Sequence, residues 1–115
     1  MTNPEQFDAD ELQLWWLDTA HDEIFPLTKK MIEYGGNGRA IDLIEIGRNL
    51  ARLSKRDVDD AEATELGIYF YLLGKMGRWT AAVQEGRRVS DDTLHDIAIY
   101  TKMVQRTRQK GAWPI

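Results

Sequence analysis

The chain has 115 residues, about one domain's length, of which 43% are apolar and 30% are charged, a composition that excludes disorder and leaves room for one modest core. Nineteen acidic residues against 15 basic ones give a net charge of −4, so the surface offers no general basic footprint for DNA or RNA, and we expect no nucleic-acid partner. The absence of cysteine excludes disulfides, a thiolate nucleophile and cysteine-based zinc sites.

The first residues lack the pattern of a signal peptide, and no apolar run approaches the roughly 20 residues of a membrane span. We therefore expect a cytoplasmic protein with no membrane association. A first helix is predicted over residues 8–34, capped by Asp8 or Asp10, because apolar residues recur at helical spacing there. Pro26 lies inside this pattern and predicts a kink or break near residues 22–25, since proline removes a backbone donor.

A glycine cluster at residues 35–38 ends this segment, and a second helix is predicted from about Arg39 to Leu53. The third, residues 60–85, follows Asp57 or Asp59 as a cap and ends at Gly86. The fourth, residues 91–109, follows Ser90 and is closed by Gly111. The predicted fold is all-α: one domain over residues 1–115, a bundle of four to five helices whose long third and fourth members are antiparallel.

Four carboxylates lie where the third and fourth helices could oppose them: Glu62, Glu65, Asp92 and Asp96. Opposed carboxylates on facing helices can hold Mg²⁺. Glu65 shares the apolar stripe of its helix, and an inward carboxylate needs a hydrogen bond, a cation or a metal. The alternatives are a salt bridge to Glu65 from an arginine such as Arg48, Arg52 or Arg78, and stabilisation of Asp92 by the first turn of its helix.

The third helix is apolar around nearly its whole circumference between Ile68 and Leu73, which indicates that both of its sides are covered. Gly67 and Gly74 are seven residues apart and would let another helix approach closely. The partner is another helix of the same chain or a second subunit. We favour a homodimer or a dimer of dimers.

Three segments together resemble a known family. Lys30-Met-Ile-Glu-Tyr-Gly35 is similar to a Lys-x-x-Asp-Tyr-Gly element, Glu65 followed by Lys75 and Arg78 resembles an acid then Lys/Arg helix, and residues 91–100 resemble a terminal acid-Asp-Thr-Leu-Leu-Asp helix. These elements belong to the phage-associated nucleotide modification associated domain type one family. Its wider relatives are the all-α, MazG-like nucleoside triphosphate pyrophosphohydrolases.

The resemblance implies a phage-type, MazG-like nucleotide-binding protein, usually oligomeric, that cleaves an α–β phosphate bond of a nucleoside triphosphate with a Mg²⁺-activated water. Glu62, Glu65, Asp92 and Asp96 would ligate the Mg²⁺ cofactor, with Glu65 and Asp96 as the catalytic pair. Substrate binding would fall to Lys75 or Arg78 for the phosphates and to Tyr69 or Tyr100 for the base.

The alternative is a non-enzymatic helical interaction protein that docks a host or phage protein, with the acids in structural salt bridges. One feature discriminates between the two hypotheses. If Glu65 and Asp96 point into a shared pocket without arginine partners, the enzyme is favoured, and if each is capped by a guanidinium, the interaction protein is favoured.

Overall fold

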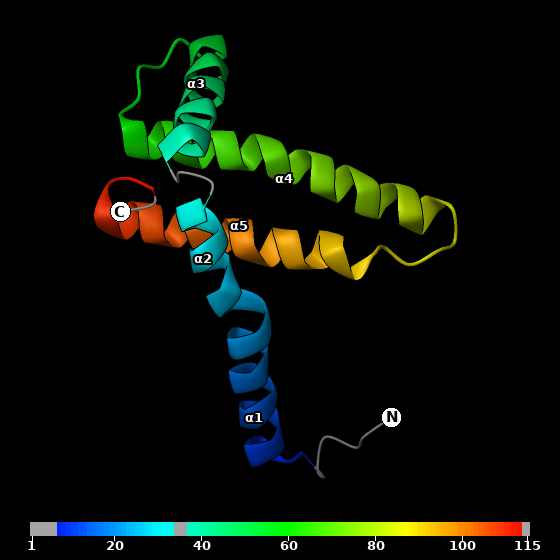
Figure 1. Cartoon of the computed structure of the whole chain (residues 1–115). Helices are drawn as coiled ribbons and strands as arrows, with labels where there is room; N and C mark the ends of the chain where they lie inside the picture. The colour runs from blue at the N-terminus through cyan, green and yellow to red at the C-terminus, as the bar shows by residue number, and fades with distance from the viewer. Residues whose placement is uncertain (1–6, 34–36, 114–115) are drawn as a thin grey trace. The chain divides into compact units, whose positions relative to one another are not determined.

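The computed structural model describes residues 7–33 and 37–113, with side chains described for residues 7–29 and 42–113. Its elements are α1 (Ala9–Thr19), a π-helical segment η2 (Ala20–Ile24), α2 (Phe25–Glu33), α3 (Asn37–Leu53), α4 (Asp60–Gln84) and α5 (Asp91–Lys110) (Figure 1). The predicted all-α class is confirmed, and the described ranges contain no strand. The resemblance to MazG-like folds stays a prediction.

Contacts along the backbone divide the chain into two compact units, residues 1–35 and residues 36–115, and each is described by itself. The prediction of a single domain stays a prediction. In the first unit, the Asp8 carboxylate caps α1 by accepting the N–H groups of Asp10 and Glu11 at 3.0 and 3.1 Å. The break expected before Pro26 is the π-helical turn η2, where the Phe25 N–H donates to the carbonyl of Ala20, five residues back.

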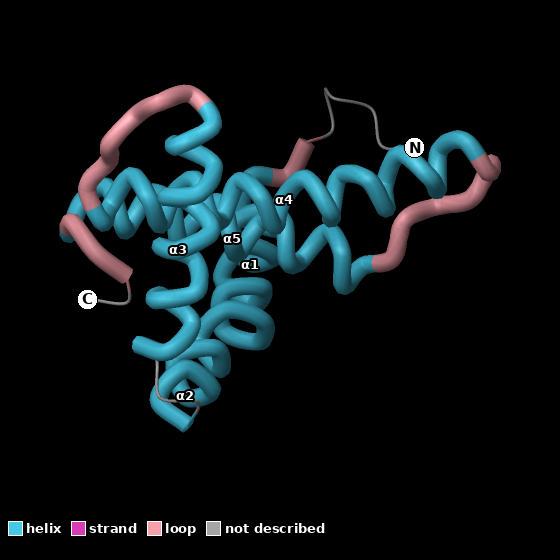
Figure 2. Tube along the Cα trace, turned by 90° about the horizontal axis from the view of Figure 1, so that it is seen from above, coloured by secondary structure: helices cyan, strands magenta, loops and turns pink. Residues whose placement is uncertain are grey.

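The second unit is built on α4. Helix α3 crosses α4 in the N-terminal half of α4 (Figure 2). The two backbones touch. A Cβ placed on Gly47 of α3 would lie 1.7 Å from the carbonyl oxygen of Ala63, and one on Gly67 of α4 would lie 2.1 Å from that of Leu43. The sequence left open whether a helix of the same chain or a second subunit approaches these glycines. At Gly67 it is α3 of the same chain, whereas a Cβ on Gly74 would meet nothing within 4 Å.

Helix α5 runs back beside α4 in the opposite direction, as predicted for the two long helices (Figure 1). Ile68, Thr64 and Thr107 are the largest fully buried side chains of the described residues. Each threonine hydroxyl donates to the carbonyl four residues earlier in its own helix, at 2.8 Å, so no buried hydroxyl lacks a partner in the described part of the chain.

The ends of the long helices follow the predicted signals. The Asp59 carboxylate accepts the N–H of Glu62 at 2.8 Å, and the Ser90 hydroxyl accepts the N–H of Thr93 at 3.3 Å. Gly86 and Gly111 have left-handed φ angles of 69° and 81°, which favour glycine after a helix. In residues 7–33 and 37–113, no helix has the length and apolar character needed to cross a membrane.

Candidate functional site

The four predicted metal ligands lie at opposite ends of the α4–α5 pair. Glu62 and Glu65 belong to the first two turns of α4, and Asp92 and Asp96 to the first two turns of α5. Because the helices are antiparallel, Asp96 contacts Lys75, ten residues beyond Glu65, which corresponds to about 15 Å along the helix. The chain does not bring Glu65 and Asp96 together.

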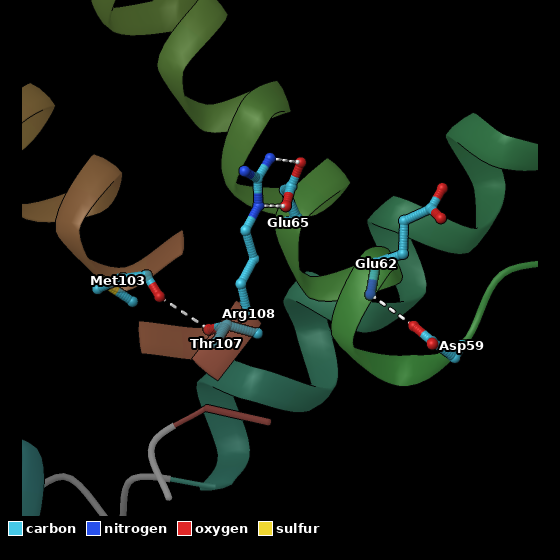
Figure 3. Close-up of polar contacts among 6 residues, drawn as sticks. All are labelled: Asp59, Glu62, Glu65, Met103, Thr107 and Arg108. Carbon is cyan, nitrogen blue, oxygen red and sulfur yellow. Dashed lines mark hydrogen bonds and ion pairs between the residues drawn. The ribbon is translucent and has the colours of Figure 1, made fainter. Parts of the chain in front are cut away.

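Glu65 forms a bidentate ion pair with Arg108 near the end of α5 (Figure 3). Arg108 Nε lies 2.6 Å from Oε1 and Nη2 lies 2.8 Å from Oε2. Hydrogen bonding by Arg108 lowers the pKa of Glu65, against an opposing effect of partial burial, and the same contact raises the pKa of Arg108. A salt bridge was one alternative for Glu65, but the partner is on α5.

None of Arg48, Arg52 and Arg78 binds Glu65, because each lies on another face of the unit. Arg48 and Arg52 belong to α3, which meets α4 along its glycine face, and they bind Asp60 and Asn49 respectively. Arg78 is exposed on α4. Arg56 binds Glu62, whose side chain extends away from the Glu65 pair in Figure 3.

Asp96 accepts a hydrogen bond from the Lys75 ammonium at 2.9 Å between Nζ and Oδ2. The Lys75 side chain is only 18% exposed, so its charge is largely satisfied within the unit. Asp92 is an exposed acid in the first turn after Ser90, a position that the helix dipole favours without any ligand. In the part of the chain that the structure describes, no group of three or more His, Asp or Glu side chains could hold a metal ion together.

The two tyrosines predicted as alternatives for contacting the base have different surroundings. The Tyr100 ring stacks on Tyr71, with centroids 6.0 Å apart and planes 2° apart. Tyr69 is half-exposed and borders an open groove of about 450 Å³ between α4 and α5. Of the predicted site residues, only Glu65 and Tyr69 line this groove. Arg108 and Lys102, which were not predicted as site residues, line it as well.

A feature that the site prediction missed lies on the outer face of α4. Six residues there alternate spacings of three and four, and we call them the outer seam: Leu66, Tyr69, Leu73, Met76, Thr80 and Val83. Tyr69, Leu73, Met76 and Val83 leave 52%, 50%, 47% and 69% of their surface exposed. The spacing of three and four residues could have been recognised in the sequence as a heptad pattern, which predicts a helix surface that packs against another helix.

The comparisons with known proteins add no relative: no family model, no curated protein and no solved structure matches the chain. The resemblance to the nucleotide modification family therefore stays a prediction, as do the Mg²⁺ cofactor and the assigned roles of the site residues.

Proposed function

We propose that the chain is a non-enzymatic helical interaction protein that docks another helical protein chain on the outer seam of α4. The observation that carries the proposal is the exposed, uncharged character of this face. Between Leu66 and Val83 the only charged residues are Lys75, which binds Asp96, and Arg78, which lies on nearly the opposite side of the helix. An apolar surface of this length on a small unit is typical of an interface.

The carboxylates support the same proposal, although only Glu65 has the guanidinium partner expected for an interaction protein. Glu65 is bound by the guanidinium of Arg108 and Asp96 by the ammonium of Lys75, each within its own chain. A Mg²⁺ ion at Glu65 would compete with a guanidinium that engages both carboxylate oxygens, and a single ion could not reach both Glu65 and Asp96 across about 15 Å. The ion pairs account for the inward acids as structural elements of the α4–α5 contact.

The binding test compares two variant baits, each of which carries one added carboxylate at an exposed position of a helix. Leu73→Glu places a carboxylate in the middle of the outer seam, while Ala98→Glu places one on the exposed surface of α5 and serves as the matched control. Tagged wild-type chain and both variants are used to capture binding proteins, which are identified by mass spectrometry and then re-bound as purified proteins. We expect binding that survives Ala98→Glu and is lost in Leu73→Glu.

Equal binding by both variants would overturn the proposal. The absence of any bound protein would overturn it too, where an untagged copy of the chain counts as a bound protein. The enzymatic alternative is tested separately by calorimetric titration with Mg²⁺ and a panel of deoxynucleoside triphosphates. Heat of binding that disappears in Asp96→Asn, together with pyrophosphate release, would establish the nucleotide hypothesis in its place.

A further inference from the structure

The outer seam has the geometry of one half of a coiled coil. Spacings of three and four alternate from Leu66 to Val83, which is the heptad period at which two helices pack side by side. Leu66, Leu73 and Thr80 take one core position of the heptad, and Tyr69, Met76 and Val83 take the other. A stripe with this period is complementary to a second stripe with the same period, and a second copy of the chain supplies one.

An antiparallel arrangement of two α4 helices aligns the seam with itself. In antiparallel coiled coils the two core positions face one another, so that Leu66 meets Val83, Tyr69 meets Thr80 and Leu73 meets Met76 of the second copy. All these layers share one centre, between residues 74 and 75. The largest seam residue thereby faces the smallest, which is the pairing that fills a core without voids.

The dipoles of the two helices favour the same direction. An antiparallel arrangement places the N-terminal end of one α4 beside the C-terminal end of the other, whereas a parallel arrangement places like ends together.

The exposed area is sufficient for a specific dimer. Phe70 and Trp79 flank the seam on its two sides and leave 49% and 38% of their surface exposed. Half of a large apolar side chain is on the order of 100 Å², so the four large seam residues and these two flanking residues offer about 600 Å² per chain. Two copies would bury about 1,200 Å², the lower end of the range for stable, specific interfaces.

We infer that the outer seam of α4 binds the outer seam of a second copy of this chain in an antiparallel coiled coil, centred between Gly74 and Lys75. The inference rests on the proposed function and names the partner at that surface.

Sedimentation of the full chain tests the inference. We expect a species of twice 13.3 kDa for the wild type and for Ala98→Glu. Leu73→Glu introduces two carboxylates into the central layers of the dimer, and we expect its dissociation constant to rise at least about 100-fold. Circular dichroism verifies that each variant is helical. A monomeric wild type at about 100 μM, or a dimer unaffected by Leu73→Glu, would overturn the inference.

The register is tested with disulfides, because the chain has no native cysteine. Chains carrying Tyr69→Cys and chains carrying Thr80→Cys are mixed and oxidised. Antiparallel pairing joins one chain of each kind, whereas parallel pairing joins like with like, since equivalent Thr80 positions lie about 16 Å apart in the antiparallel dimer. Like-with-like disulfides would overturn the antiparallel arrangement.

The two proposals fail in different ways. A monomeric chain that binds a different protein through Leu73 would refute self-association and leave the interaction function intact. A monomeric chain without any protein partner at the seam would refute both.

Discussion

The contact between α3 and α4 makes a sharp prediction for Gly47→Ala. The added Cβ would stand 1.7 Å from the carbonyl oxygen of Ala63, and both sides of the contact are helix backbone that no rotamer change can move. To reach even 3.0 Å, the helices would have to separate by about 1.3 Å at the crossing point. Such a separation would weaken the packing of Leu43 and Ala51, which belong to the buried core.

The expected magnitude combines two opposing effects. Overpacking that forces backbone shifts costs about 3 kcal/mol at the upper end of its usual range. Replacing a helical glycine by alanine returns about 1 kcal/mol through helix propensity. We therefore expect Gly47→Ala to lower the free energy of unfolding by about 2 kcal/mol, or the melting temperature by about 10 °C for a unit of this size.

Gly74→Ala is the matched control, because it is also a helical glycine to alanine change but a Cβ there meets nothing within 4 Å. It should raise the free energy of unfolding by up to about 1 kcal/mol. Urea denaturation at one fixed protein concentration, followed by circular dichroism, measures both variants. If Gly47→Ala were as stable as Gly74→Ala, the two helix backbones could not be in contact at Gly47.

Two further changes test the ends and the ion pair of the α4–α5 hairpin. Because Arg108 holds the folded pKa of Glu65 below its unfolded value near 4.5, the pair's contribution is full above that pH and is lost as pH falls through the folded pKa. The melting temperature of the wild type should thus decline more steeply below pH 5 than that of Glu65→Gln, and parallel declines would show that the pair contributes nothing to folding. Gly111→Ala should cost about 1 kcal/mol in urea denaturation because the residue has a φ of 81°, and Gly111→Asn should recover part of the loss if the left-handed cap is the cause.

The helix boundaries could be predicted from the sequence because each depends on a few neighbouring residues. Asp59 and Ser90 cap α4 and α5 through hydrogen bonds within three residues, and Gly111 ends α5 through its own backbone angle. The hydrogen-bonding irregularity before Pro26 is equally local, since it follows from one missing N–H group. Elements of this kind need no knowledge of the fold.

The partners of the carboxylates could not be predicted in this way. Arg108 lies 43 residues after Glu65, and their contact depends on how far α5 extends back along α4. The length of α4 and the connection between Gln84 and Asp91 set this register. Helical spacing identified Glu65 as an inward acid, but it carries no information about which residue of another helix lies at the same level. The sequence therefore predicts a salt bridge to an arginine as one alternative for Glu65, but Arg108 takes the place of the examples Arg48, Arg52 and Arg78.

The apolar circumference of Ile68 to Leu73 was anticipated too, but the fold divides it unequally. Helix α3 covers the glycine face of α4 and α5 covers the face of Ile68 and Lys75. The outer seam takes the remaining third of the circumference; its residue Tyr69 borders the groove beside α5, and Leu73, Met76 and Val83 are about half-exposed or more. A helix that packs against two helices of its own unit and keeps a third face uncharged and exposed has a surface typical of contact with another protein chain.

This third neighbour also bears on the carboxylate site, because a second chain could in principle unite acids that one chain keeps apart. The antiparallel dimer does not do so. The centre of the dimer lies between Gly74 and Lys75, so Glu65 of one copy is level with Gln84 of the other copy. Asp96 of that other copy is level with Lys75 of its own chain. Glu65 and Asp96 thus remain more than about 10 Å apart along the helices, within a chain and between chains. A Mg²⁺ ion bound jointly by these two carboxylates would contradict both the interaction function and the dimer proposed for it.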